Sequence, residues 1–212
     1  MRSIPDSPGF LSSQFHQEHL DAKYSGLMLR TITYFGLSYC SRGIMKGGVI
    51  IPLHNAENYL IGHAHQRVKD TATRKCNHSY SFRASRERGG KLLEHHRSQF
   101  VYNANRIAWP MENVIVAEGF STVWWLTQRG YPDCTAVMSN TCSEEQSDII
   151  VSMLVPNGLV WILTGGDNAD DRCAESIFAQ VASRRPVRWV KLPQGCLTDF
   201  TQGALKKIFW KS

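Results

Sequence analysis

Acidic residues follow three apolar stretches of this 212-residue sequence, and their positions are suited to holding a metal ion. Glu118 follows "VIVA", Asp167 follows "WILT" and two glycines, and Asp199 lies in the stretch "PQGCLTDF". Asp170 is a fourth acid, close behind Asp167. Mg²⁺ and Mn²⁺ bind carboxylate oxygens and keep coordination positions open for substrate phosphates. The chemistry predicted from these acids is metal-assisted phosphoryl or nucleotidyl transfer.

The C-terminal half of the sequence alternates between predicted strands and predicted helices, which would position these acids. Four apolar runs predict buried strands, at residues 114–116, 135–138, 159–163 and 187–192. The three segments between these runs have the apolar periodicity of helices. Strands that are joined through helices make right-handed crossovers, and therefore form a parallel sheet with helices on both faces. Ligands of such sheets lie beyond the carboxyl ends of the strands, where the three acidic stretches fall.

Capping and turn residues predict where these helices begin and end. Ser143 and Gln146 have the spacing of a capping box at the start of the second helix. Gly130 is expected just past the end of the first helix, and the turn residues 156–158 are expected to end the second. The buried face of the third helix is predicted to carry Ala174, Ile177, Phe178 and Val181.

Basic residues are concentrated in residues 67–106. This segment has ten Lys or Arg against three Asp or Glu, a charge of +7 in a chain whose formal charge is +6. Lys and Arg gain affinity for polyanions by releasing the counterions of phosphates. The segment therefore predicts a nucleic-acid-binding surface, with a solvated basic loop as the alternative.

The composition argues against several other classes of protein. Six cysteines occur without a CxxC pair, so that no structural zinc site is expected. No stretch approaches the roughly 18 apolar residues of a membrane-spanning helix. We therefore expect a soluble, cytoplasmic protein with no membrane contact, whose 42% hydrophobic residues suffice for a packed core.

The acidic stretches together resemble the motifs of the Toprim domain, which is shared by bacterial-type primases, topoisomerases and some nucleases. "VIVAEGF", "ILTGGDNADD" and "LPQGCLTDF" occur in the order of that family's Glu-Gly strand end, acidic loop and later acidic turn. Upstream, "ITYFGLSYCSRGIMKGGVIIPLHNAENYLIGHAHQR" and "HHRSQFVYNANRIA" are similar to the part of the primase catalytic core that precedes Toprim. Within this upstream part, residues 49–53 and 59–61 are predicted strands around the polar turn "HNAEN".

This resemblance implies an α/β fold with a Toprim-like four-stranded parallel sheet flanked by helices, preceded by a smaller α+β primase-core subdomain. The expected division is a tail and helix at residues 1–33, a primase-core-like subdomain with the basic segment at 34–106, and a Toprim domain at 107–212. The zinc-binding module that precedes many primase cores has no counterpart in residues 1–33. No zinc cofactor is therefore expected, whereas Mg²⁺ or Mn²⁺ is.

The resemblance also implies roles for individual residues. Glu118 matches the catalytic acid that serves as general base or positions a metal, and Asp167 matches a catalytic metal ligand. Asp199 matches an acid of the third motif, and Asp170 is a nearby carboxylate that could join the metal site. Phosphate contacts with nucleic acid or nucleotide are expected from Lys46, Arg67 and Arg97.

Several positions depart from the family pattern, and Asp170, which replaces the last glycine of the acidic loop, is one of them. Gly165 stands where the first loop aspartate belongs, Leu197 replaces another acid of the third motif, and Gly48 stands where a basic residue is common. The metal motifs are therefore degenerate, and two hypotheses for function stay open.

The first hypothesis is a DNA primase-like nucleotidyltransferase of DNA replication, which makes short RNA primers from nucleoside triphosphates on a single-stranded DNA template. A replicative helicase is a further candidate partner. The second hypothesis is a catalytically silent Toprim protein that binds nucleic acid. Nuclease or topoisomerase-like cleavage is a weaker third reading, because the upstream half matches primases better.

Overall fold

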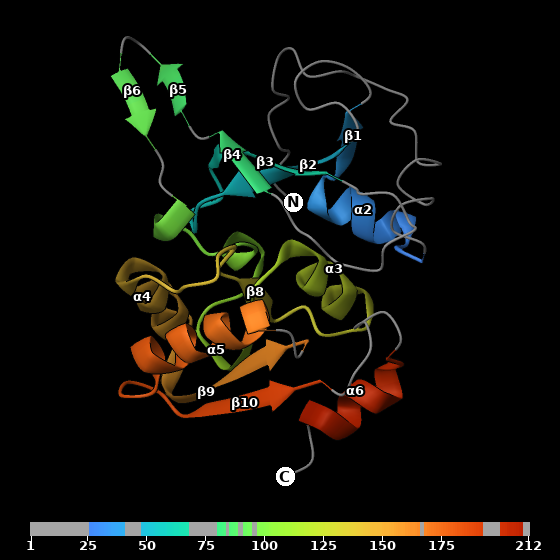
Figure 1. Ribbon diagram of the computed structural model, residues 1–212, viewed down its shortest axis with the longest axis vertical. Coiled ribbons are helices and arrows are strands. Elements are labelled where there is room, and N and C mark those ends of the chain that lie inside the picture. Colours follow the sequence, from blue (N-terminus) through green and yellow to red (C-terminus); the bar gives the residue numbers. More distant parts are fainter. Residues whose placement is uncertain are drawn as a thin grey trace.

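The computed structural model describes residues 26–40, 48–67, 80–83, 85–88, 91–94, 97–165, 168–192 and 200–209. The elements from α2 to β6 lie toward one end of the molecule, and those from β7 to α6 lie toward the other (Figure 1). In chain order the elements are α2 (Leu29–Phe35), β1 (Ser38–Cys40), β2 (Gly48–His54), β3 (Leu60–Arg67), β4 (Tyr80–Arg83), β5 (Ser85–Arg88), β6 (Lys91–Glu94), the 3₁₀ helices η1 (Arg97–Gln99) and η2 (Ala104–Arg106), β7 (Met111–Ala117), α3 (Phe120–Gln128), β8 (Cys134–Ala136), α4 (Glu144–Ser152), β9 (Leu154–Thr164), α5 (Asn168–Val181), β10 (Val187–Lys191) and α6 (Gln202–Phe209).

The C-terminal half contains a four-stranded sheet with the strand order β10-β9-β7-β8, in which every pair is parallel. The chain passes from β7 to β8 on one side, and then crosses back over β7 to β9 and β10 on the other. The direction of winding therefore reverses between β7 and β9. This arrangement confirms the four-stranded parallel sheet that the apolar runs predict.

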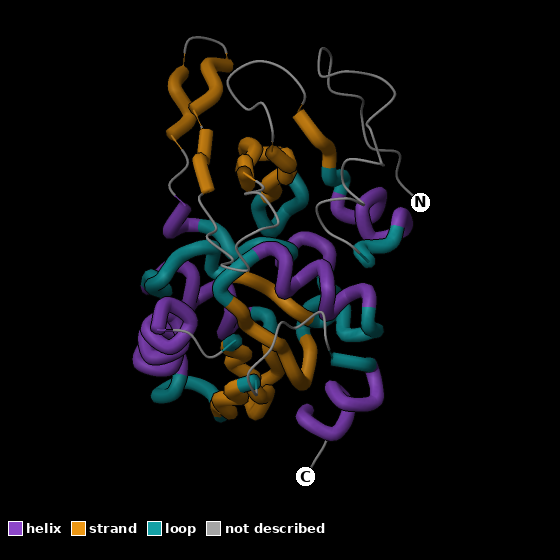
Figure 2. The backbone as a smooth tube through the Cα atoms, turned by 45° about the vertical axis from the view of Figure 1, so that its right-hand side comes forward, coloured by secondary structure: helices purple, strands orange, loops and turns teal. Residues whose placement is uncertain are grey.

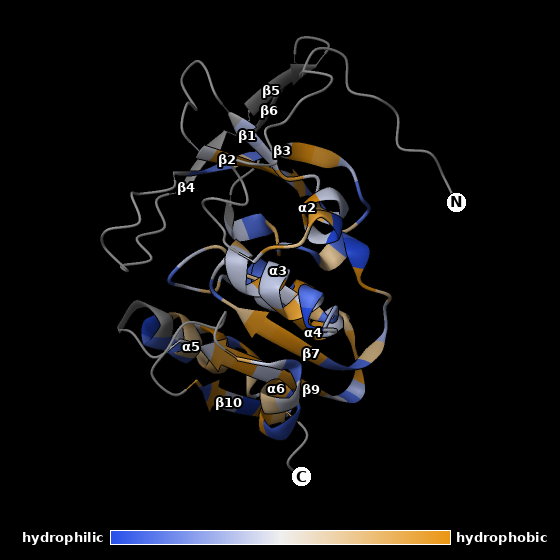
Figure 3. Ribbon diagram, turned by 90° about the vertical axis from the view of Figure 1, so that its right-hand side faces the viewer, coloured by the Kyte–Doolittle hydropathy of each residue, from blue (hydrophilic) through white to orange (hydrophobic). Residues whose placement is uncertain are grey.

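Alternate residues of the central strands pack against different helices. The even-numbered Val114, Val116, Val160 and Ile162 share a core cluster with α4 and α5. The odd-numbered Ile115, Trp161 and Leu163 share another cluster with α3 and α6. Side chains on a strand alternate between its two faces, so each face of the sheet has its own helical layer. Figure 3 shows that β7 and β9 of this sheet are largely hydrophobic.

The helix boundaries agree with the predicted capping residues. Two other predictions, a turn at residues 156–158 and the burial of Phe178, are wrong. α4 begins with a complete capping box between Ser143 and Gln146, and Gly130 follows α3 with a φ of 89°. The expected turn at residues 156–158 is wrong, because β9 already begins at Leu154 and the three turn residues lie in a register shift of its pairing with β7. Phe178 is also 47% exposed rather than buried.

The other three residues of the predicted α5 face, Ala174, Ile177 and Val181, are buried in the cluster of α4 and α5.

The N-terminal half contains an antiparallel sheet with the order β1-β2-β3-β4. The β2–β3 hairpin confirms the strands predicted around "HNAEN". Its turn is closed by the side chain of Asn55, whose Oδ1 accepts a hydrogen bond from the Tyr59 N–H at 2.8 Å, and Asn58 has a φ of 67°. Figure 2 shows the two larger groups of strands as separate layers with helices and loops between them.

Four aromatic side chains join the two halves. Phe35 of α2 stacks on Tyr102 with a centroid distance of 5.9 Å, and Tyr102 contacts Phe120 of α3 edge-on at 4.7 Å. The indole of Trp124 donates a hydrogen bond to the Tyr102 hydroxyl at 2.9 Å. All four rings are buried in one core cluster, which we call the aromatic junction.

The junction packs residues from both sides of the expected domain boundary at residue 106, and α2 runs across the boundary expected at residue 33. The division into domains stays a prediction. Among the described helices, none is long and apolar enough to cross a membrane.

Candidate functional site

Glu118 lies at the carboxyl edge of the parallel sheet, beside the point where the winding reverses. Val116 of β7 is paired with Ile162 of β9, so two residues farther along the same register Glu118 falls level with Thr164, the last residue of β9. The Glu118 carbonyl accepts a hydrogen bond from the Met138 N–H at 2.9 Å, which fixes this position to the end of β8. Crevices at such reversal points are where open α/β sheets bind their ligands.

The end of β9 is flanked on its other side by an ion pair. Thr164 is paired with Lys191, the last residue of β10, and the Leu192 N–H donates to the Thr164 carbonyl at 2.9 Å. The Lys191 Nζ lies 2.6 Å from Oδ2 of Asp171, in the first turn of α5. The carboxyl edge thus carries Glu118, Thr164 and Lys191 on three neighbouring strands. Lys191 was missed from the sequence, where only its place at a predicted strand end could have pointed to it.

The predicted metal ligands are only partly covered by the described residues. Asp167, Asp199 and Lys46 lie outside them. For Asp170 the described part is the backbone, in the first turn of α5. In the described ranges, no three His, Cys, Asp or Glu side chains come together as metal ligands.

Gly165 is described, and it is exposed directly after β9. The acid expected at this loop position is therefore missing next to Thr164, and Asp171 in the following helix already has a cationic partner. Among the described acids, Glu118 alone stands at the strand end that the resemblance assigns to a catalytic acid.

Two of the predicted phosphate contacts are described by their backbone. Arg67 is the last residue of β3, and Arg97 is the first residue of η1. The segment after Arg97 is tied to the carboxyl edge by α4. The hydroxyl of Ser143 donates to the Ser98 carbonyl, and Nε2 of Gln146 donates to the carbonyls of Phe100 and Val137, both at 2.8 Å.

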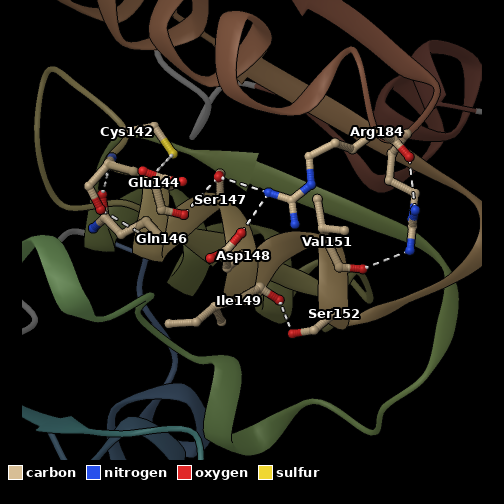
Figure 4. A network of polar contacts seen from close by, with 11 residues as sticks. Cys142, Glu144, Gln146, Ser147, Asp148, Ile149, Val151, Ser152 and Arg184 are labelled. Carbon is tan, nitrogen blue, oxygen red and sulfur yellow. Dashed lines mark hydrogen bonds and ion pairs between the residues drawn. The ribbon is translucent and has the colours of Figure 1, made fainter.

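Further polar contacts hold α4 in place along its length. Figure 4 shows the side chains along α4, from Cys142 and Gln146 near its start to Ser147 and Asp148, which meet Arg184. Arg184 follows the end of α5, and its guanidinium lies 2.6 Å from Oδ1 of Asp148 in α4. The hydrogen bonds of α4 therefore hold Phe100, just after η1, beside Val137, although the two are distant in sequence.

A second cationic group lies at the junction of the two halves. The Arg106 guanidinium faces the rings of Tyr34 and Phe35, at 5.8 Å and 5.5 Å from their centroids. Next to it, Nδ2 of Asn105 donates a hydrogen bond to Oδ1 of Asn58 in the β2–β3 turn at 2.7 Å. The exposed aromatics Tyr34, Tyr59 and Trp109 adjoin these residues in sequence or in contact.

His54, at the end of β2, is kept neutral by its surroundings. Burial, together with the positive charges of Arg106 and His63, lowers its pKa from 6.5 to about 4. Near neutral pH, Arg106 therefore supplies charge at this place and His54 does not. A cation beside an exposed aromatic ring, here Arg106 beside Tyr34, is suited to contacts with stacked bases and phosphates.

No protein-family model and no curated protein matches the sequence. Solved structures do match the fold. A DnaG primase catalytic domain bound to ssDNA superposes with a TM-score of 0.62 and 16% identity, over 90% of this chain and 68% of that chain. The zinc-binding and RNA polymerase domains of the Aquifex aeolicus primase give a TM-score of 0.69 and 16% identity, over 91% and 55%.

The RNA polymerase domain of the Mycobacterium tuberculosis primase DnaG gives a TM-score of 0.66 and 12% identity, over 94% of this chain and 77% of that chain. The described architecture is therefore that of a primase catalytic core, with both the antiparallel and the parallel sheet. The fold expected from the Toprim-like motifs is confirmed.

Proposed function

We propose that this protein is a DNA primase-like nucleotidyltransferase, which joins nucleoside triphosphates into short RNA primers on a single-stranded DNA template. The observation that carries the proposal is the position of Glu118 at the winding reversal of a sheet with the primase-core fold. The cytoplasm and a replicative helicase belong to the same proposal as location and partner.

The proposed reaction forms a bond between the 3′-oxygen of the primer and the α-phosphorus of the incoming nucleotide, and pyrophosphate leaves. The Glu118 carboxylate takes up the proton of the attacking hydroxyl, as a general base at the sheet edge. Lys46, Arg67 and Arg97 contact the phosphates of template and nucleotide. An Mg²⁺ or Mn²⁺ ion held by Glu118, Asp167 and Asp199, with Asp170 nearby, would neutralise the charge that develops on the phosphates.

Primer synthesis is tested with the purified chain, single-stranded template, labelled nucleoside triphosphates and Mn²⁺. We expect short labelled products from the wild type and at least a hundredfold less from Glu118→Gln, the usual size of a lost general base. Glu175→Gln is the matched control, because Glu175 is an exposed acid on the solvent side of α5. Failure of the wild type to extend any template, with the fold intact by circular dichroism, would sink the proposal.

A second candidate function is nucleic-acid binding without catalysis. It is favoured by Gly165 at the end of β9, where an acid is missing, and by the engagement of Asp171 with Lys191. In that case the basic segment, together with Arg106 and the exposed ring of Tyr34, would bind single strands through their phosphates and stacked bases.

The two candidates are separated by titrating fluorescent single-stranded DNA at several salt concentrations. A silent binder shows a steep loss of affinity with salt but no products in the primer assay. Arg106→Gln is expected to weaken binding and to lower the salt slope by about one, because one cation is removed. An absence of binding even at low salt would exclude both candidates.

A further inference from the structure

A pocket of about 790 Å³ lies at the amino-terminal edge of the parallel sheet. It is lined by the start of β7 at Met111–Asn113, by Trp161 of β9, by the α3–β8 loop and by α6. Glu118 follows the other end of β7, which is seven residues long, so the two edges are about 20 Å apart. The pocket is therefore separate from the site of the proposed nucleotidyl transfer.

Aromatic rings form the apolar part of the pocket. Trp161 and Phe209 are 5% and 3% exposed and pack edge to face at 5.7 Å. The half-buried ring of Tyr131 lies 5.3 Å from Phe209. The volume is within the range of about 300–1,000 Å³ that is usual for sites of small organic ligands.

Charged side chains determine what such a ligand can carry. Among the described residues, the lining includes the exposed carboxylates of Glu112 and Asp133 and one ammonium group, that of Lys206. Within this lining the carboxylates outnumber the ammonium group, and the local charge disfavours phosphates and favours a cation. The same aromatic surroundings already hold one guanidinium, because Arg188 lies 5.2 Å from the centroid of Trp161.

We propose that this pocket binds an organic cation, namely an ammonium, amidinium or guanidinium group on an apolar body. The apolar body packs against the half-buried ring of Tyr131, and the cationic group interacts with the exposed carboxylates of Glu112 and Asp133. The cation is either a free small molecule or an arginine side chain of a protein partner, since both present the same chemistry.

Gly203 allows the pocket to be filled without disturbing the fold. It lines the pocket in the first turn of α6, and a β-carbon added there would meet only Oγ1 of Thr201, at 4.0 Å. Gly203→Leu therefore places a side chain in the open space, and it also replaces a glycine that is unfavourable in a helix. Gly203→Ala is the matched control, because it adds the helix-favouring methyl group and leaves most of the volume free.

The test uses benzamidinium and its neutral isostere benzamide, with binding followed by the NMR shift of the Trp161 indole N–H. This group donates to Oδ1 of Asn113 in the pocket wall at 3.3 Å and is assigned from its loss in Trp161→Phe. We expect benzamidinium to bind at least about tenfold more tightly than benzamide, as two carboxylates and an aromatic face imply. Equal binding of the two probes, or no binding, overturns the proposal.

Variants test the sign of each charge. The double variant Glu112→Gln, Asp133→Asn is expected to weaken benzamidinium binding about tenfold, and Lys206→Met to strengthen it. Glu57→Gln with Glu175→Gln removes two exposed acids elsewhere and is expected to change nothing. Gly203→Leu should abolish binding that Gly203→Ala retains, and a Gly203→Leu protein that still binds would overturn the proposal.

The source of the cation is distinguished by a second pair of probes, N-acetyl-arginine amide and its neutral analogue N-acetyl-citrulline amide. Tighter binding of the arginine amide than of benzamidinium supports a protein-borne arginine, and the reverse order supports a free cation. None of these measurements involves nucleotides or template, so their outcome is independent of the primer assay.

Discussion

The side-chain nitrogen of Gln146 lies 2.8 Å from the carbonyl oxygen of Phe100, and it donates to the Val137 carbonyl at the same distance. One buried amide thus ties the segment that follows Arg97 to the carboxyl edge of the sheet. Its Oε1 also accepts the N–H of Ser143 and completes the capping box of α4. Together with the Ser143 hydroxyl, which donates to the Ser98 carbonyl, this side chain holds the segment after Arg97 next to the carboxyl edge.

Gln146→Leu is expected to lower the free energy of unfolding by about 2–4 kcal/mol, because it leaves buried carbonyls without a donor. It should also weaken single-stranded DNA binding under conditions where the protein is folded, since the segment after Arg97 loses one of its hydrogen bonds to α4, the one at Phe100. Urea unfolding and a DNA titration measure the two effects.

Gln128→Leu is the control for this prediction. Gln128 also makes several hydrogen bonds, to Gly26, Met28 and Thr31, but it is half-buried, so water can replace them. An equal loss of stability and of DNA affinity in both variants would contradict the role given to Gln146.

Gly48 is expected to tolerate no side chain while His65 is present. A β-carbon at position 48 would lie 2.0 Å from Nε2 of His65 and 2.8 Å from the carbonyl oxygen of Gln66. Gly48→Ala should therefore destabilise the protein by about 1–3 kcal/mol, the usual cost of overpacking. His65→Gly in the same chain should recover part of this loss but not all, because the backbone contact remains. Additive effects of the two substitutions in urea unfolding would refute the coupling.

The stability of the protein should fall on mild acidification, partly through His54. Its pKa of about 4 in the folded chain is below the ordinary value of 6.5, so the unfolded chain takes up a proton between these pH values that the folded chain does not. The free energy of unfolding therefore decreases as the pH falls through this window, and increases as it rises. His54→Gln should show a shallower decrease between about pH 6.5 and pH 5 in urea unfolding, and an unchanged slope would contradict the prediction.

Gly165→Asp is expected to restore a metal ligand. Position 165 is exposed at the end of β9, one residue past the level of Glu118, so a carboxylate fits there without repacking the core. We expect the affinity for Mn²⁺ to rise at least tenfold, the effect that a ligand-shell residue usually has. Glu118→Gln in the Gly165→Asp chain should remove the gain, measured by calorimetry. A gain that survives Glu118→Gln would show that the added acid binds the ion away from the proposed site.

The parallel sheet could be predicted because its strands are buried on both faces. Continuous apolar runs such as "VIVA" and "LVWIL" are what such burial requires, and they appear directly in the sequence. The start of β9 could not be predicted, because Pro156 and Gly158 are residues typical of a turn. They are accommodated by a register shift at the edge of the pairing with β7, which depends on the neighbouring strand.

The candidate site shows the same division. The position of Glu118 at the carboxyl edge could be predicted from its motif, because the residue after a buried strand must lie at that edge. The ion pair of Lys191 with Asp171 depends on the register of β10 against β9 and on the packing of α5, neither of which has a local signature. The hydrogen bond from Gln146 to the Phe100 carbonyl could not be predicted for a similar reason. The capping box is a local pattern, whereas this hydrogen bond joins residues that are distant in sequence.

The aromatic junction couples the thermal unfolding of the two halves. Phe35 belongs to the first half and Trp124 to the second, and both lose all contact with solvent in the same cluster. Unfolding of either half would expose buried aromatic rings of the other to solvent. Both halves are therefore expected to unfold on heating in one cooperative step. A fragment that begins at residue 107 would expose Phe120 and Trp124, which are buried against Phe35 and Tyr102 in the 212-residue chain.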